Sequence, residues 1–501
     1  MTKVSSAVKD WIRNHETIIF PLLAFIIPLA VRTIPEILMG PYVVGFDTIG
    51  YYIPNALLWL HNGINFWNFI ATAPLFYAIY VPLVSAGGSP VFLIKIISPL
   101  LLGFLGLSIY SYAQRGLNWS LAKSAFVAVL GTVYFVALRA SWDQLREELG
   151  LAFFFIVLML LADRKNNSRK HYVLLSLATI LTVLSHQLVA VLMFGVIIFT
   201  VAYSLLRKDF KRSINLIVAS LPAALYFVVV YIGGILRSNI LGYSNAVSPL
   251  TGFASYQPLL INAGEFFLYC FLPLLPIAVI GFLRFRNLQL DTWLLLSFIL
   301  VFIPLSSVNP YRWILLLTYP FAFYATDALS KLKSIKWARF RLIVFRIAIL
   351  YLFLSTAILS FGFLLTTAEK PFIYFNPQYF NGYSYEIPTS MLQNTISLAD
   401  CRDTSLALQW FEGNMNSSAV LLTHTVFYGW ALLTLNKSQV VDYGFGDPVS
   451  AAALAVQEGH IQVYLVWWIN GKGWEGQPTV TSSFHQIHQI GDIAIYQYVA
   501  N

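Results

Sequence analysis

Residues 45–52 read Gly-Phe-Asp-Thr-Ile-Gly-Tyr-Tyr and follow directly on the first long apolar run of the chain. Asp47 therefore stands at the edge of an apolar segment, between two glycines and ahead of two tyrosines. A carboxylate in such a place is costly unless it faces water, a partner group or a substrate. We interpret Asp47 as the centre of a membrane-embedded active site. The alternative is an interfacial acid that caps the helix after it, and the residues alone leave both interpretations open.

The composition is that of an integral membrane protein. Of the 501 residues, 58% are hydrophobic and 11% are charged, and the mean hydropathy is +0.70. Soluble proteins carry roughly a quarter charged residues. Cys270 lies in an apolar run and Cys401 in a polar tail, so we expect no disulfide framework. The N-terminus has basic residues followed by an apolar run from about Thr17, without a clear cleavage site. This pattern predicts a retained signal anchor.

Eleven apolar runs reach about the length of a membrane span. They cover residues 17–39, 91–114, 124–140, 149–163, 171–186, 187–206, 213–233, 263–283, 290–307, 313–330 and 343–366. With the N-terminus in the cytoplasm, the alternate loops on that side hold 21 of the 31 Lys and Arg residues, as the positive-inside rule requires. The net charge of +9 then reflects membrane topology, and we expect no nucleic-acid partner.

This layout places four segments outside the cell membrane. The first, residues 40–90, contains Asp47 and is interrupted by prolines and by Gly87-Gly88, which favours helices lying on the membrane surface. The second is the acidic turn 139–148, the third is residues 234–262 and the fourth is the turn 306–313. If the first segment crossed the membrane once, every later loop would change sides and the basic loops would face outward, so we exclude a membrane span there.

The chain becomes polar after residue 368. Strands are expected at 419–423, 439–442, 462–467 and 493–499, and helices at 404–413 and 448–458. We therefore predict a transmembrane domain over residues 1–368 and an extracytoplasmic α/β domain over 369–501. The fold class is mostly α: a polytopic membrane protein with about 11 transmembrane helices and a small C-terminal α/β domain.

The turn 139–148 carries a second acidic cluster. Asp143 and Glu147 are four residues apart, and Asp143 and Arg146 are three apart, so one helix would place them on one side. They could serve as a second carboxylate for an acceptor or as a metal ligand, with Arg146 on a phosphate. The alternative is a solvated turn with an internal ion pair, which we favour for the turn alone.

Three further residues are candidates for binding an anion. Arg312 is the one basic residue of its turn and suits bidentate contact with a phosphate. Lys95 lies one turn inside the second apolar run, where it must reach the surface or pair with an anion. His186 lies at a helix end and could donate to a leaving phosphate or orient an acid. For Lys95 and His186 a structural role is an equal alternative.

The predicted outer face thus gathers acids, bases and aromatic residues, a pattern that fits a lipid-phosphate substrate with its tail in the bilayer. The chain contains no Walker loop, dinucleotide fingerprint, HExxH or CxxC motif, so ATP, NAD and zinc sites of those types have no support.

In these motifs and in its whole layout the chain resembles the GT-C superfamily of polyprenyl-phosphate-sugar-dependent membrane glycosyltransferases. The matching residues are Gly45-Phe-Asp47 with Tyr51-Tyr52, Trp142-Asp143-Gln-Leu-Arg146, Ser185-His186-Gln187 and Tyr311-Arg312-Trp313. The style is closest to archaeal dolichyl-phosphate-mannose mannosyltransferases. The resemblance implies that Asp47 is the catalytic base or positions the acceptor, with Asp143 in support. Expected to bind the donor phosphate or the substrate are Arg312, Lys95, Arg146, His186, Tyr51, Tyr311 and Glu147.

One departure concerns the oligosaccharyltransferase branch, which has a Trp-Trp-Asp-x-Gly motif. The nearest string here is Trp467-Trp468-Ile469-Asn470, which lacks the Asp. We therefore do not expect en-bloc N-glycan transfer. Metal dependence belongs to that branch, so the cofactor requirement stays open between none and a divalent cation.

The expected function is inverting transfer of a sugar from a polyprenyl (dolichyl) phosphate to a protein or glycolipid acceptor at the outer membrane face. One alternative is a flippase or other transporter, which predicts charges buried within the spans. The predicted spans are nearly free of charge apart from Lys95 and Glu265 near helix ends, which speaks against transport. The other alternative is a non-catalytic membrane scaffold.

Overall fold

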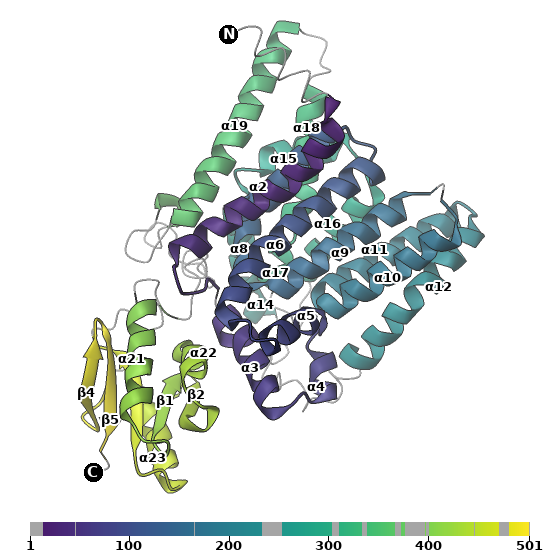
Figure 1. Ribbon diagram of the computed structural model, residues 1–501. Helices are drawn as coiled ribbons and strands as arrows, with labels where there is room; N and C mark the ends of the chain where they lie inside the picture. The colour runs from purple at the N-terminus through teal and green to yellow at the C-terminus, as the bar shows by residue number, and fades with distance from the viewer. Residues whose placement is uncertain are drawn as a thin grey trace.

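The computed structural model describes residues 14–45, 47–164, 166–232, 253–302, 310–332, 338–365, 372–375, 396, 400–444, 446–469 and 480–499. The protein consists of a helical bundle and a small C-terminal α/β domain. This domain lies at one end of the bundle (Figure 1).

The bundle is built from the N-terminal two thirds of the chain. Its elements are α2 (Glu16–Leu38), η1 (Thr48–Tyr52), α3 (Ile53–Asn62), α4 (Phe66–Ala71), α5 (Leu75–Ser85), α6 (Pro90–Ser111), η2 (Tyr112–Gly116), α7 (Leu121–Val133), α8 (Phe135–Asp143), α9 (Leu145–Ala162), α10 (Arg169–Ser185), α11 (Gln187–Leu206), α12 (Phe210–Tyr226), η3 (Phe227–Ile232), α14 (Phe253–Phe271), α15 (Leu275–Arg284), α16 (Leu288–Phe302), α17 (Pro310–Leu315), α18 (Thr318–Leu332) and α19 (Ala338–Leu365).

Helices lie at every range where a membrane span was predicted. Among the described residues, five are long and apolar enough to cross a membrane, and seven if each bent pair counts as one span. The number of eleven spans and the orientation of the termini stay predictions. Two predicted spans are broken: α7 and α8 meet at 61°, and the last part of α14 meets α15 at 90°. The second break contains Pro273, whose ring and missing N–H interrupt a helix.

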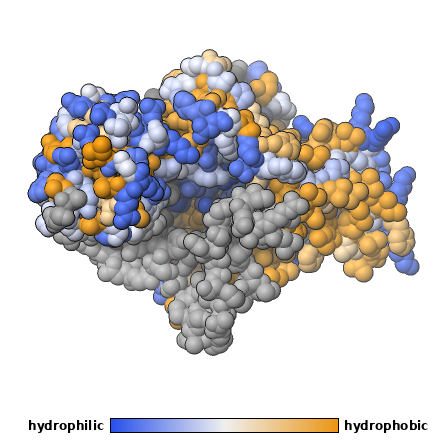
Figure 2. Space-filling model, turned by 90° about the horizontal axis from the view of Figure 1, so that it is seen from below, coloured by the Kyte–Doolittle hydropathy of each residue, from blue (hydrophilic) through white to orange (hydrophobic). Residues whose placement is uncertain are grey.

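The surface of the bundle is apolar. Large hydrophobic side chains are exposed along α11, α12, η3 and α19; Leu206, Val229 and Phe353 are 83%, 65% and 65% exposed. Figure 2 shows that hydrophobic residues dominate the bundle, whereas hydrophilic residues predominate on the domain at the left. Such a surface is stable only in lipid. The chain is a multi-pass membrane protein.

The C-terminal domain contains a five-stranded sheet in the order β2-β1-β3-β5-β4. Strand β1 pairs in parallel with β2 and β3, while β5 pairs antiparallel with β3 and β4. The described elements are η4 (Ile373–Phe375), α21 (Cys401–Asn414), β1 (Val420–His424), α22 (Thr425–Thr434), η6 (Lys437–Gln439), β2 (Val440–Gly444), α23 (Pro448–Gln457), β3 (Val463–Trp468), β4 (Phe484–Ile490) and β5 (Ile493–Tyr498).

Four predicted strands and both predicted helices of this domain are present, each within a few residues of the expected bounds. Asp447 caps α23 by accepting hydrogen bonds from the backbone N–H groups of Val449 and Ser450, as its position before Pro448 indicated. Helix α22 and strand β4 were not predicted. The expected boundary at residue 368 lies outside the described residues.

Helix α22 packs against η1 and α3, and so against the segment that carries Asp47. Gly429 of α22 lies so close to η1 that an added Cβ atom would overlap the carbonyl oxygen of Ile49. The rings of Trp430 and Tyr42 lie 6.0 Å apart beside this contact. Ile49 and Tyr52 belong to the same hydrophobic core as Phe427 and Trp430. The domain and this segment therefore share one packed core.

Candidate active site

Asp47 lies at the start of η1, at the bundle end next to the C-terminal domain. Its backbone is helical and its side chain makes no capping hydrogen bond, so the helix-capping interpretation finds no support. The carboxylate keeps 32% of its side-chain surface exposed, and its Oδ2 atom lies 3.7 Å from Nη2 of Arg312. Asp47 is thus free to meet a substrate beside a guanidinium group.

Backbone contacts fix this loop against the end of α8. The hydroxyl of Thr48 donates a hydrogen bond of 3.3 Å to the carbonyl oxygen of Trp142. Gly45 has a φ of +111°, and an added Cβ would overlap the same carbonyl, so only glycine suits this position. Trp142 precedes Asp143 in sequence, and the contact therefore brings the two predicted acidic segments together.

The turn 139–148 differs from the prediction in two respects. The helix breaks at Gln144 (φ −101°, ψ 45°), so Asp143 and Arg146 do not share one helix. Asp143 instead pairs with Arg139 at 2.6 Å. The turn is also not solvated, because Asp143, Glu147 and Glu148 are only 4%, 1% and 4% exposed. Buried carboxylates are costly, which favours a functional origin for this cluster.

Arg146 binds the neighbouring surface segment. Its Nη1 donates to the backbone carbonyl of Thr72. Its guanidinium lies 4.9 Å from the ring centre of Tyr51 and 5.6 Å from that of Tyr52, which is cation–π distance. The predicted residues Arg146 and Tyr51 are therefore in contact with each other.

His186 connects α10 to α11 and lies beside α9. Its Nδ1 atom is 4.0 Å from Oε2 of Glu147. Neither oxygen of Glu147 has a hydrogen-bond partner within the described structure, and neither does Nδ1. The guanidinium groups of Arg146 and Arg312 also lie close enough to act on this imidazole. His186 thus belongs to the same buried charged cluster as Glu147 and the two arginines.

The electrostatic surroundings of Asp47 match a base that works near neutral pH. Burial, first, and the neighbouring carboxylate of Asp143 raise the pKa of Asp47 to about 6. The guanidinium groups that act against this shift are those of Arg312, Arg146 and Arg139. At pH 7 the carboxylate is mostly ionised, and its pKa is close enough to neutrality for proton transfer.

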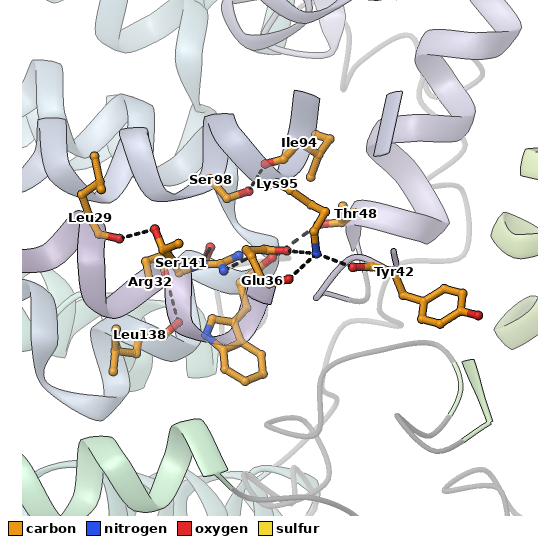
Figure 3. Close-up of polar contacts among 12 residues, drawn as sticks. Leu29, Arg32, Glu36, Tyr42, Thr48, Ile94, Lys95, Ser98, Leu138 and Ser141 are labelled. Atoms are coloured by element: carbon orange, nitrogen blue, oxygen red, sulfur yellow. Dashed lines mark hydrogen bonds and ion pairs between the residues drawn. The ribbon is translucent and has the colours of Figure 1, made fainter. Parts of the chain in front are cut away.

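Lys95 belongs to a separate polar network between α2 and α6. Figure 3 shows its ammonium group directed at Glu36 and at the Tyr42 carbonyl. Nζ donates to the Glu36 carboxylate at 3.0 Å, to the Glu36 carbonyl at 2.6 Å and to the Tyr42 carbonyl at 2.5 Å. An ammonium has three donors, so all are used. Binding a phosphate would require Lys95 to break these bonds.

The same network corrects the expectation that the spans are nearly free of charge. Arg32 and Glu36 lie within α2, are 0% and 3% exposed, and pair at 2.7 Å. Arg32 Nε also donates to the Ser141 carbonyl of α8. Glu36 is paired with both Arg32 and Lys95, and such mutual pairing is typical of a structural network rather than of a transport path.

The structure thus brings together most of the predicted site residues around Asp47. They are Asp143, Arg146, Glu147, His186, Arg312 and Tyr51. The side chain of Tyr311 lies outside the described residues. Arg139 was missed as a site residue, although its spacing of four from Asp143 could have identified it. Within the described part of the chain, no three His, Cys, Asp or Glu side chains form a group able to hold a metal ion.

Comparison with known proteins gives a likeness of fold. The chain matches no family model and no curated protein. It is similar to crystal structures of ArnT from Cupriavidus metallidurans in the apo state (TM-score 0.54, 14% identity, 98% of each chain covered). It is likewise similar to the same protein bound to undecaprenyl phosphate (TM-score 0.52, 13% identity, 97% and 98% covered).

A second similar structure is a mutant of the arabinofuranosyltransferase AftD from Mycobacteria, with a TM-score of 0.55 and 12% identity. The match covers 96% of this chain and 41% of that one. At such low identities the likeness is one of fold alone. The shared fold extends over nearly the whole of this chain.

Proposed function

We propose that the protein is a glycosyltransferase that moves a sugar from a polyprenyl phosphate to an acceptor at the outer membrane face. The observation that carries the proposal is the pairing of the partly exposed Asp47 carboxylate with Arg312 at 3.7 Å. A base for the acceptor and a cation for a phosphate are thus neighbours, in a fold shared with a protein that has been crystallised with undecaprenyl phosphate.

In the proposed reaction, Asp47 takes the proton of the acceptor hydroxyl or amide. The acceptor atom attacks the anomeric carbon from the side opposite the phosphate. The bond between that carbon and the phosphate oxygen breaks, and polyprenyl phosphate leaves with the electron pair. The configuration at the anomeric carbon is inverted. This assignment follows general base catalysis by a carboxylate whose pKa lies near the working pH.

The basic residues would stabilise the departing phosphate. Arg312 is partly exposed beside Asp47, and its guanidinium can contact two phosphate oxygens. Arg146 lies deeper, on the Tyr51 and Tyr52 rings, and would add to the positive potential. Charges fixed in place before reaction stabilise a transition state without reorganisation.

Asp143 and Glu147 would hold this arrangement together. Asp143 is paired with Arg139, which fixes the end of α8 under the Asp47 loop. Glu147 lies between His186 and the positive potential of Arg312. The Lys95 network would act one step further out, since Lys95 binds the Tyr42 carbonyl at the start of the segment leading to Asp47.

The specific expectations also remain proposals: a dolichyl carrier, a mannosyl donor, a protein or glycolipid acceptor, and a C-terminal domain on the extracytoplasmic side. The carrier, donor and acceptor rest on the sequence resemblance, and the placement of the domain rests on the distribution of basic residues among the loops.

The experiment is transfer of radiolabelled sugar from a panel of undecaprenyl- and dolichyl-phosphate sugars to membrane acceptors by the purified full-length chain. Asp47→Asn is compared with Glu412→Gln, which neutralises an exposed acid of α21. We expect Asp47→Asn to lose at least about a hundredfold in rate, and Glu412→Gln to match the wild type. Equal rates for Asp47→Asn and wild type would remove Asp47 as the base. Absence of transfer by the wild type with every donor would favour a transporter or a scaffold.

A further inference from the structure

A polar cavity lies at the end of the bundle opposite to Asp47. It has a volume of about 270 Å³ and is enclosed by the last residues of α9 and α11 and the first residues of α12 and α16. In Figure 1 the junction of α11 and α12 lies at the right, on the side of the bundle away from the C-terminal domain. The lining of the cavity comprises Gly116, Leu161, Ala162, Arg164, Thr200, Tyr203, Ser204, Arg207, Asp209, Arg212, Asn287, Leu288 and Gln289.

The cavity is far from the proposed sugar-transfer site. Glu147 lies in the first turn of α9 and Leu161 in its last turn. A rise of 1.5 Å per residue separates them by about 20 Å. A ligand in this cavity therefore does not contact Asp47, and the cavity is a separate feature of the protein.

Three arginines converge on this cavity. The guanidinium groups of Arg164 and Arg207 lie 4.9 and 5.4 Å from the ring centre of Tyr203. Arg207 Nε also donates to the Tyr203 hydroxyl at 3.2 Å. Arg212 is 6% exposed, and its Nη2 donates to the carbonyl of Leu161 at 2.6 Å. Tyr203 and the α9 backbone thus hold the three side chains in place.

The positive charge of these arginines is only partly offset by the protein, because the carboxylates of Asp209 and Asp163 act on Arg212. None of the three forms an ion pair with a carboxylate of the described chain. One carboxylate, that of Asp209, lines the cavity, and its Oδ1 accepts the backbone N–H of Arg212 at 3.2 Å. Three guanidinium groups against the carboxylates of Asp209 and Asp163 still leave an excess of positive charge at the cavity.

One amide of the lining is oriented to donate. Oδ1 of Asn287 accepts from the backbone N–H groups of Gln289 and Leu290, each at 3.1 Å. The single hydroxyl proton of Tyr112 is shared between this oxygen, at 3.3 Å, and Oε1 of Gln289, at 2.8 Å. Those bonds fix the orientation of the side-chain amide. Its NH₂ group donates no hydrogen bond within the described structure. Guanidinium forks and amide N–H groups are the donors that bind phosphate.

The border of the cavity is partly apolar. Leu206 and Phe210, which stand next to the lining residues Arg207 and Asp209, are 83% and 61% exposed, and Ile214 is 60% exposed. Such side chains lie in the hydrocarbon of a bilayer. A ligand with a phosphate in the cavity and acyl chains along α11 and α12 would satisfy both surfaces.

We propose that this cavity binds the phosphate headgroup of an anionic membrane lipid, independently of the sugar-transfer site. Basic residues at helix ends ordinarily record topology alone. Here three of them share one cavity with a buried member, an aromatic support and an oriented amide, and this combination distinguishes the cavity from a solvated basic loop.

The test is native mass spectrometry of the purified full-length protein titrated with phosphatidic acid, phosphatidylcholine or inorganic phosphate. Arg164→Gln/Arg207→Gln removes two cavity charges. Arg169→Gln/Lys211→Gln removes two exposed charges of the same end that do not line the cavity. We expect the first pair to weaken phosphatidic acid binding at least about tenfold and the second pair to change it less than about twofold.

Equal weakening by both double variants would mean that surface charge alone attracts the lipid, and would overturn the proposal. So would equal affinity for phosphatidic acid and phosphatidylcholine. Inorganic phosphate is expected to bind at least about tenfold more weakly, because it has no acyl chains to contact the apolar border; equal affinity would overturn the assignment to a lipid. Sugar transfer should persist in both variants, which separates this test from that of Asp47.

Discussion

Nη2 of Arg312 lies 3.7 Å from Oδ2 of Asp47, although the two residues are separated by most of the helical bundle in sequence. The guanidinium lowers the pKa of this carboxylate, while burial and Asp143 raise it. The balance leaves Asp47 ionised at neutral pH and still basic enough to accept a proton. The guanidinium of Arg312 is also positioned to contact a phosphate. In the proposed reaction Asp47 would therefore act on the acceptor and Arg312 on the donor.

The first prediction concerns the pH dependence of wild-type transfer. Asp47 must be deprotonated to act as a base, and its pKa is raised to about 6. We therefore expect kcat/KM to fall below pH 6, to rise through about pH 6 and to level off above it. Initial rates between pH 4.5 and 8.5 in a constant ionic strength buffer measure this. An acid limb near pH 4 would contradict it.

The second prediction concerns Arg312→Gln. Loss of the guanidinium removes a group that lowers the pKa of Asp47, so the acid limb should move upward by about one pH unit. The rate at the plateau should fall about a hundredfold, because the leaving phosphate loses a cation. The matched control is Arg286→Gln, which removes an exposed arginine paired with Asp291. A fall in the plateau rate without a shift of the acid limb of the pH profile would show that Arg312 does not influence the pKa of Asp47.

The third prediction concerns Lys95→Met. This change removes three hydrogen bonds and leaves Glu36 paired with Arg32 alone. We expect a loss of about 2 kcal/mol in the free energy of unfolding and a lower kcat with little change in the KM for donor. Thermal unfolding in detergent and steady-state kinetics measure both. Unchanged stability with a raised donor KM would instead support phosphate binding by Lys95.

The fourth prediction concerns the contact between the C-terminal domain and η1. A side chain at Gly429 would overlap the Ile49 carbonyl, whereas one at Gly413 of α21 meets nothing within 4 Å. Gly429→Val should therefore reduce transfer about tenfold or more through displacement of the Asp47 loop. Gly413→Val makes the same substitution within a helix, where valine has a higher helix propensity than glycine, and it should behave as wild type. Limited proteolysis reports whether the domain is displaced; equal rates for both variants would show that the contact is not needed.

The sequence predicted the helical fold and the residues that meet around Asp47. The alternation of loops with and without basic residues was sufficient to place Asp47, Asp143, His186 and Arg312 at one end of the bundle, since each lies in a loop on the side with few basic residues. The sequence did not show which of the side chains at that end pair with each other. The break at Gln144, which turns Asp143 toward Arg139, has no proline or glycine to mark it.

The role of Lys95 could not be read from the sequence because its partners depend on how α2 packs against α6. Glu36 lies 59 residues away, and nothing in either helix indicates the other. Strand β4 was missed for a different reason. Its sequence, Phe484-His-Gln-Ile-His-Gln-Ile490, has no alternation of polar and apolar residues, because most of this edge strand is exposed.

The contact of Gly429 with Ile49 has a consequence for biosynthesis. Ribosomes add about 5–20 residues per second, so α22 emerges some tens of seconds after the Asp47 loop has entered the membrane. During that interval the loop lacks the helix that packs on it. Under the proposed function, chains that end before α22 would be inserted in the membrane but inactive. Sugar transfer would begin only after α22 has been made, so incomplete chains would not consume lipid-linked sugar.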